Sequence, residues 1–137
     1  MNAPVINLGN RLDDNLEVFR AFAEKSFRHR NKNEVRYFAY LLREEDVANG
    51  LSVGLTPEAA VRHLDTNEGY CRIAVRDIHS LPYGLEVRAD PEDPQHAFIC
   101  NLPLQTISND SREQARLIAG HLARKSIVVT CDPINAL

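Results

Sequence analysis

Three side chains in the first half of the chain, Arg36, Arg43 and Ser52, are of types that bind charged groups. Arg36 and Arg43 lie in or beside an apolar stretch, and a guanidinium offers several donors in one plane to an anion. In this interpretation the arginines bind an anion in a cleft, to which Ser52 would add a hydroxyl. In the alternative interpretation, both arginines lie on the solvent face of a strand.

His96 is the histidine whose sequence surroundings point most clearly to chemistry. It follows an acidic segment bounded by Pro91 and Pro94, which we expect to be a rigid loop, and it opens an apolar stretch. His96 can pair with Asp90 or Asp93 and titrate near neutral pH. The structural alternative is that His96 fixes the loop through a hydrogen bond and has no further role.

A local basic cluster could contact a phosphate or an acidic partner. Its members are Lys25, Arg28, Arg30 and Lys32. The whole chain has 16 basic and 19 acidic residues and a net charge of −3, which is too balanced for a general nucleic-acid-binding protein. The alternative is that the cluster ends a helix, where positive charge suits the helix dipole.

The sequence predicts neither a metal site nor a bound cofactor. The five histidines show no helical metal-binding spacing, and the three cysteines contain no Cys-x-x-Cys pair. Phosphate-binding glycine loops are absent as well. Cys71 and Cys100 lie in apolar runs, so we expect buried free thiols.

The first 53 residues contain one predicted helix and two predicted strands. Apolar residues at intervals of three and four predict a helix from residue 12 to about 27. Aromatic and branched residues predict a strand over 35–42, and a brief alternation predicts a short strand over 51–53. The apolar positions of that helix are Leu12, Leu16, Phe19, Phe22 or Ala23, and Phe27.

Two further helices have local start signals. Thr56 can accept a free backbone N–H and Pro57 suits the first helical position, which predicts a short helix over 56–64. Asp110 begins a capping box with Glu113, followed by an apolar stripe, which predicts a helix from there to about residue 125.

Strand patterns dominate the region between these helices. Alternation predicts strands over 70–76, 85–88 and 96–100, with a helical turn over 77–81. A β-branched run predicts a last strand over 127–130. The hairpin-scale spacing favours an α+β fold, with a mixed or antiparallel sheet of about five short strands and about three helices.

Length and composition indicate one ordinary domain. With 137 residues, 44% hydrophobic and 26% charged, we expect an irregular N-terminal arm over 1–11, a globular domain over 12–132 and a tail over 133–137. No apolar run approaches the roughly 20 residues of a membrane span. The first residues do not resemble a signal peptide, so we expect a cytoplasmic protein.

The order of several short motifs resembles that of small bacterial proteins to which we can attach no activity. The motifs are Gly50-Leu51-Ser52-Val53, then Thr56-Pro57-Glu58-Ala59-Ala60, then Asp90-Pro91 and His96-Ala97-Phe98-Ile99. The resemblance covers roughly residues 36–125. It implies no particular reaction.

A partial match to compact ADP-ribosyltransferases is also present. Such enzymes have a basic residue on an early strand, a serine-centred strand followed by a helix, and a late catalytic glutamate. Arg36 or Arg43 resembles the first feature, and Ser52 with Thr56 resembles the second. The third is missing, because the late strand contains His96 and no glutamate.

Three functions follow from these patterns. The absence of a complete catalytic constellation favours a non-catalytic module that binds another protein or a second copy of itself. A nucleotide-binding or ADP-ribosyltransferase-like enzyme is the alternative, and it requires Arg36, Ser52 and His96 to meet in one cleft. A nucleic-acid-associated protein using the cluster between residues 25 and 32 is the third.

Overall fold

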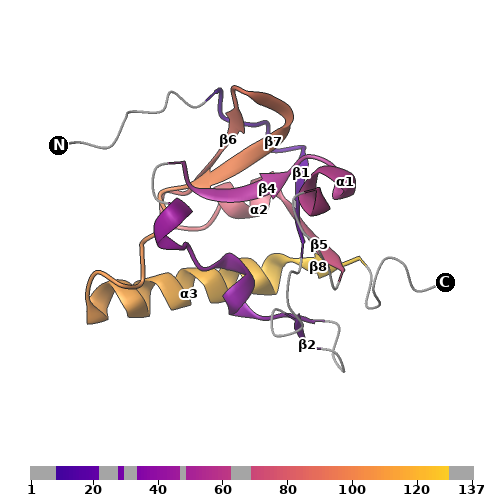
Figure 1. Cartoon of the computed structure of the whole chain (residues 1–137). Coiled ribbons are helices and arrows are strands. Elements are labelled where there is room, and N and C mark those ends of the chain that lie inside the picture. Colours follow the sequence, from indigo (N-terminus) through magenta and orange to yellow (C-terminus); the bar gives the residue numbers. More distant parts are fainter. Residues whose placement is uncertain (1–8, 22–27, 30–33, 47–48, 63–68, 130–137) are drawn as a thin grey trace.

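Six antiparallel strands form the sheet on which the whole fold is built (Figure 1). The structure is a computed structural model that describes residues 9–21, 28–29, 34–46, 49–62 and 69–129. The strands are β1 (Glu17–Ala21), β4 (Leu51–Gly54), β5 (Tyr70–Ala74), β6 (Glu86–Asp90), β7 (Asp93–Cys100) and β8 (Ile127–Val128). Their order across the sheet is β6-β7-β4-β1-β5-β8.

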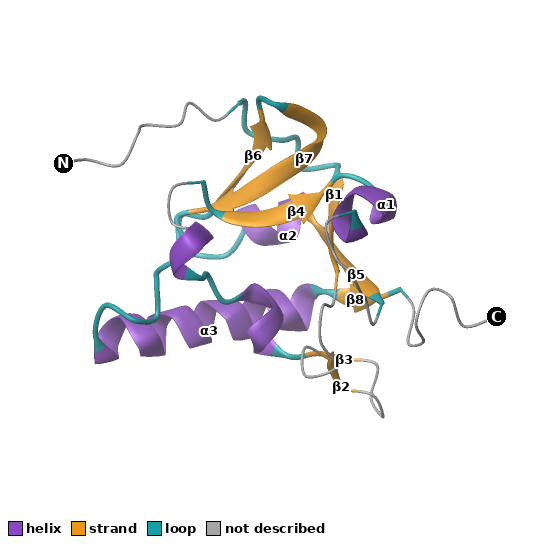
Figure 2. Cartoon of the chain, in the orientation of Figure 1, coloured by secondary structure: helices purple, strands orange, loops and turns teal. Residues whose placement is uncertain are grey.

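Helices and short turns surround this sheet (Figure 2). The helices are α1 (Pro57–Val61), α2 (Val75–His79) and α3 (Asn109–Lys125), and the 3-10 turns are η2 (Tyr37–Tyr40) and η3 (Glu44–Asp46). A separate two-stranded hairpin is formed by β2 (Arg28–His29) and β3 (Glu34–Val35). The predicted α+β class is therefore confirmed.

The two faces of the sheet carry different side chains, as the alternation of a strand requires. Leu51 and Val53 of β4 are buried and pair in register with Ile99 and Ala97 of β7. These four residues share the face that contributes to the hydrophobic core. Ser52 lies between them on β4 and therefore points to the opposite face.

The core lies between the sheet and α3, which runs alongside η2 in Figure 1. Ser108 caps α3 by accepting a hydrogen bond from the backbone N–H of Ser111 at 3.0 Å. The predicted cap at Asp110 is therefore wrong by two residues, because Ser108 already satisfies the free N–H. The buried stripe of the helix is Ala115, Ile118, Ala119, Leu122 and Ala123.

The helix predicted from residue 12 to about 27 is wrong. Residues 17–21 form β1, a central strand that pairs with β4 on one side and β5 on the other. Val18 is fully buried, whereas Leu16, which the helical pattern placed inside, is 42% exposed. Sheet partners on both sides outweigh a weak intrinsic preference for helix. Residues 22–27 of that prediction lie outside the described residues.

The strand predicted over 35–42 is also wrong beyond its first residue. Val35 ends β3, and Tyr37–Tyr40 form η2. Ala39 and Tyr40 are consecutive and both buried, which a helical turn allows and an alternating strand does not. The Tyr40 hydroxyl reaches Ser126 Oγ at 2.6 Å and Cys71 Sγ at 3.4 Å. Burial raises the pKa of Tyr40 well above its usual value, so this hydroxyl stays protonated.

Other predicted boundaries shift by a few residues. The strand predicted over 70–76 ends at Ala74, where α2 begins, and the last strand ends at Val128. Asp90 and Asp93 pair across the β6–β7 turn, so the predicted acidic loop is a tight hairpin. Thr56 caps α1 as predicted, accepting from the Ala59 N–H at 3.0 Å.

Residues 9–11, the described part of the arm that was expected to be irregular, are attached to the sheet. Gly9 donates to the Ala89 carbonyl at 2.8 Å, and Ala89 donates back to Asn10 at 3.0 Å. The Leu12 N–H reaches the Val87 carbonyl at 2.8 Å. Residues 9–12 thus run along β6 instead of lying apart from the domain.

Two glycines give opposite predictions for stability. A Cβ on Gly54 would lie 2.5 Å from the Ala60 nitrogen, whereas one on Gly120 would meet Arg124 Nη1 at 3.6 Å. We expect Gly54→Ala to lower the free energy of unfolding by about 1–3 kcal/mol, because α1 must move away from β4. The control Gly120→Ala should raise it by about 0.5–1 kcal/mol through helix propensity. Urea unfolding followed by circular dichroism measures both. A Gly54→Ala variant as stable as the wild type would contradict this packing.

Candidate functional site

Ser52, His96 and Asp90 form a chain of hydrogen bonds on the outer face of the sheet. The Ser52 hydroxyl contacts His96 Nε2, and His96 Nδ1 lies 3.0 Å from Asp90 Oδ2. The side chains of His96 and Asp90 are 14% and 18% exposed, so the pair is shielded but reachable. Of the two aspartates predicted as partners, His96 uses Asp90.

Strand register explains why the serine and the histidine meet. Ser52 pairs with Phe98, and Gly54 pairs with His96, across β4 and β7. Residues two apart on adjacent strands share a face, so Ser52 and His96 are diagonal neighbours. The ring of Phe98 packs edge-on against His96 with centroids 4.8 Å apart and limits how the imidazole can turn.

The carboxylate of Asp90 is held by the turn that follows it. Its Oδ1 accepts the Glu92 backbone N–H at 2.8 Å, which leaves Oδ2 for the histidine. An ionised carboxylate only accepts hydrogen bonds, so Nδ1 of His96 carries a hydrogen toward Asp90, and in the neutral imidazole Nε2 then presents a lone pair. That lone pair faces the Ser52 hydroxyl.

A second set of contacts ties this turn to α1. Arg62, which follows the helix, donates to Asp93 Oδ2 at 2.7 Å and to Gln95 Oε1 at 2.9 Å. Asp93 Oδ1 accepts the Gln95 N–H at 3.0 Å. That hydrogen bond first, and Arg62 after it, lower the pKa of Asp93 below 3.8. We call Arg62, Asp93 and Gln95 the hairpin clamp.

Arg20 of β1 lies where two central strands separate. The pairing of β1 with β4 is limited to Phe19 and Gly54. Arg20 bridges the gap, because its Nε donates to the Ala39 carbonyl at 2.7 Å and its Nη1 to the Ser52 carbonyl at 2.8 Å. Burial lowers the pKa of Arg20, but a guanidinium stays charged in proteins.

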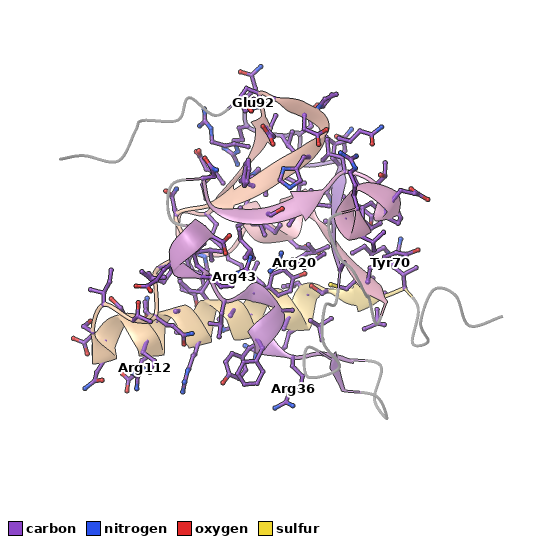
Figure 3. The ribbon with its side chains drawn as sticks, viewed as in Figure 1. Arg20, Arg36, Arg43, Tyr70, Glu92 and Arg112 are labelled. Atoms are coloured by element: carbon purple, nitrogen blue, oxygen red, sulfur yellow. The ribbon has the colours of Figure 1, made fainter. Side chains whose placement is uncertain are left out.

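The separation of the strands opens a pocket of about 310 Å³. Two arginines line it, Arg20 from β1 and Arg43 from the segment before η3, and none of the described lining residues is a carboxylate. Arg43 pairs with Asp46 at 3.2 Å and its side chain is 65% exposed. Figure 3 labels both arginines, which lie between β4 and α3 in that view. The described lining residues are Phe19, Arg20, Ala21, Arg43, Ser52, Val53, Gly54, Ala59, Ala60 and His96.

The structure brings together three of the predicted site residues, Arg43, Ser52 and His96. Arg36 is not part of this pocket. It precedes η2, and its guanidinium lies over the Phe38 ring, 5.1 Å from the centroid. In Figure 3 it lies apart from the other labelled arginines, beside the β2–β3 hairpin. The expected convergence of Arg36 with Ser52 and His96 is therefore wrong, and Arg20 stands in its place.

The predicted basic cluster falls mostly outside the described residues. Lys25, Arg30 and Lys32 are among the residues that are not described, and Arg28 is described only as the backbone of β2. Its role as a nucleic-acid or protein contact therefore stays a prediction.

His79 has a structural role. His79 Nε2 accepts the Val87 backbone N–H at 3.0 Å, and Nδ1 lies 2.7 Å from Asp14 Oδ1. The hydrogen bond with His79 lowers the pKa of Asp14. With 3% of its side chain exposed, His79 joins α2 to β6, and it is not among the described residues that line the pocket beside Ser52.

The two described cysteines differ in burial. Cys71 is buried as predicted, and burial raises its pKa. Cys100 is half-buried, with its pKa also raised by burial. Within the described ranges, no three His, Cys, Asp or Glu side chains are grouped to hold a metal ion.

Arg20 is a site residue that the sequence analysis did not identify. The helix predicted over 12–27 includes Arg20, and a helix there would give it no pairing with the strand that carries Ser52. The useful signal was the pentapeptide Glu17-Val18-Phe19-Arg20-Ala21, in which an arginine follows two residues of high strand propensity.

Comparison with family models, with curated proteins and with solved structures gave no match. Among the described residues, no helix has the length and apolar character needed to cross a membrane. Function is therefore inferred from the geometry of the pocket.

The hairpin clamp predicts a specific pH dependence of stability. Because the folded pKa of Asp93 is below its usual 3.8, the ionised carboxylate stabilises the fold above about pH 4. That contribution is lost as the pH falls through the folded pKa. We expect the stability advantage of the wild type over Asp93→Asn to be constant at pH 5–7 and to shrink below pH 4.

Urea unfolding at half-unit pH steps measures this difference. The control Glu113→Gln removes one exposed carboxylate of α3 that is outside the clamp. An advantage over Asp93→Asn that stays unchanged down to pH 3 would show that the Asp93 charge does not support the hairpin.

Proposed function

We propose that the pocket binds a phosphate-bearing nucleotide of the dinucleotide class, and that the chain is an ADP-ribosyltransferase-like enzyme. The observation that carries this proposal is the presence of both Arg20 and Arg43 in the lining of one pocket, to which the described part of the chain adds no carboxylate. Guanidinium groups match phosphate oxygens in charge and shape. Arg20 is also held rigidly by two backbone carbonyls, so little entropy is lost when it binds an anion.

The order of the pocket residues along the chain supports the same proposal. Arg20 supplies a basic residue on the first strand. Ser52 lies on a strand followed directly by the Thr56-capped helix α1. The late strand β7 contributes His96 at the position where the resemblance calls for a glutamate. Arg20 thus replaces Arg36 and Arg43 as the counterpart of the early basic residue.

The histidine can perform part of the task of the missing glutamate. A nicotinamide-releasing transfer needs an acceptor close to the ribose, to hold a hydroxyl and favour the positive charge that develops there. His96 Nε2 becomes such an acceptor when the ribose hydroxyl displaces the Ser52 hydroxyl, because Nδ1 is committed to Asp90. When His96 takes up a proton, the Asp90 carboxylate stabilises the imidazolium.

The remaining lining residues suit one end of a nucleotide. Phe19 offers an aromatic side chain to the pocket and packs edge-on against Tyr70 with centroids 6.2 Å apart. An aromatic ring of a ligand can stack on such a side chain. A volume of about 310 Å³ is at the lower end for small-molecule sites. We therefore expect the pocket to enclose one half of a dinucleotide, with its phosphates near Arg43.

Two other functions remain as predictions. A non-catalytic module would bind its ligand or partner in this pocket without turnover. A nucleic-acid-associated protein would bind through the cluster between residues 25 and 32, and its affinity would fall steeply with salt.

Nucleotide binding is tested by calorimetry with NAD⁺, ADP-ribose, AMP and adenosine. We expect the three phosphate-bearing compounds to bind and adenosine to bind at least tenfold more weakly. Arg43→Gln should weaken binding of ADP-ribose on the order of 10-fold to 100-fold, the loss of one charge-assisted hydrogen bond. Arg112→Gln, an exposed change on α3, is the matched control and should have no effect.

The outcomes separate the alternatives. Binding of NAD⁺ with release of nicotinamide, reduced in His96→Gln, supports the enzyme. Binding without release supports the non-catalytic module. If none of the phosphate-bearing compounds binds, or if Arg43→Gln binds them as well as the wild type does, the pocket is not a nucleotide site.

A further inference from the structure

The connectivity of Ser52, His96 and Asp90 is that of a nucleophile, a base and an orienting carboxylate. We propose that Ser52 is an activated nucleophile that accepts an acyl group from a carboxylic ester carrying an additional negative charge. This activity goes beyond nucleotide binding and does not depend on it.

The hydrogen-bond directions support the assignment. Asp90 fixes the hydrogen of His96 on Nδ1, so the unprotonated Nε2 is directed at the Ser52 hydroxyl. A base of this kind removes the hydroxyl proton as the oxygen attacks. Asp90 is itself held by the Glu92 N–H, so all three groups have fixed orientations.

Other described serines use their hydroxyls differently. Ser80 donates to the Asp77 carbonyl at 3.1 Å, and Ser126 donates to the Leu122 carbonyl at 2.9 Å. Both are local hydrogen bonds at the end of a helix, in which the hydroxyl donates to a backbone carbonyl. Ser52 instead faces a histidine from a strand 44 residues away in sequence and lines a pocket.

The charge of the pocket suits the reaction. The tetrahedral intermediate of acyl transfer carries a negative oxygen, which positive groups in fixed positions stabilise. Arg20 and Arg43 are the cations that line this pocket. Arg20 points to the core face, like the buried Val18, and anchors the Ala39 and Ser52 carbonyls at the margin of the pocket. Arg43 is therefore the cation to which we assign the additional negative charge of the ester.

The proposed step is balanced. The Ser52 oxygen bonds to the carbonyl carbon of the ester while its proton moves to His96 Nε2. The bond between that carbon and the leaving oxygen breaks, and the proton on Nε2 passes to the leaving alcohol. Water then attacks the seryl ester, transfers a proton through His96 to Ser52 Oγ and releases the carboxylic acid. No oxidant or reductant is required.

An alkyl fluorophosphonate probe tests the nucleophile directly, because its reaction with serine forms a phosphonyl ester and releases HF. Intact-mass and peptide mass spectrometry should place one adduct on Ser52. Ser52→Ala should abolish this adduct. His96→Gln and Asp90→Asn should slow its formation by at least 100-fold and 10-fold, respectively. Ser80→Ala, a matched change of an exposed serine, should label as the wild type does.

A pair of esters tests the substrate class. We expect the 4-nitrophenyl monoester of adipic acid, whose carboxylate is too far from the ester to close a five- or six-membered anhydride, to release nitrophenol at least tenfold faster than 4-nitrophenyl acetate does, after the release without protein is subtracted for both. Arg43→Gln should reduce that preference, because it removes a positive charge from the pocket lining. Circular dichroism of each variant verifies that the fold is retained.

Several results would overturn the inference. An unlabelled Ser52 in the folded wild type, or equal labelling in His96→Gln, would show that the serine is not activated. Equal hydrolysis of the two esters would overturn the anionic substrate. These outcomes are distinct from those for nucleotide binding, because calorimetry with ADP-ribose is performed on unlabelled protein and needs no reactive serine.

Discussion

The arrangement of the pocket depends on the hydrogen bonds made by the guanidinium of Arg20. It lies where β1 and β4 part, and it gives the Ser52 and Ala39 carbonyls the donors that a neighbouring strand would otherwise supply. Buried carbonyls without partners are costly, so a sheet that opens in its middle needs such a bridge. The same side chain that donates to these backbone carbonyls also lines the pocket. Structural support and ligand recognition thus converge on one side chain.

The reactive groups are held from both ends of the pocket. On one side, the β6–β7 turn fixes Asp90, and the hairpin clamp joins that turn to α1. On the other, Gly54 lets α1 approach β4 so closely that no side chain would fit between them. A site placed on strands and clamped by a helix keeps its geometry better than one placed on a free loop.

Sequence reasoning found those parts of the site whose signals are local. The Thr56-Pro57 start of α1 and the pairing of His96 with an acidic neighbour depend on residues close in the chain. Arg20 was missed because its role arises from β4 and η2, which are distant in sequence. The aromatic run around Tyr40 predicted a strand but forms η2 for a similar reason. The burial of Tyr40 against Cys71 and Ser126 depends on tertiary packing. Arg36 resembled a ligand-binding residue only while it was assumed to lie on a strand.

The hydrogen bonds between residues 9–12 and β6 have a consequence for solubility. A strand at the margin of a sheet offers unpaired backbone groups to other chains, and natural proteins cover or shorten such margins. Here the segment from Gly9 to Leu12 occupies the outer side of β6, and the strand at the opposite margin, β8, is two residues long. Loss of the N-terminal segment would leave β6 open to pairing between molecules, so an expression clone that begins after Leu12 is expected to aggregate even if its pocket is intact.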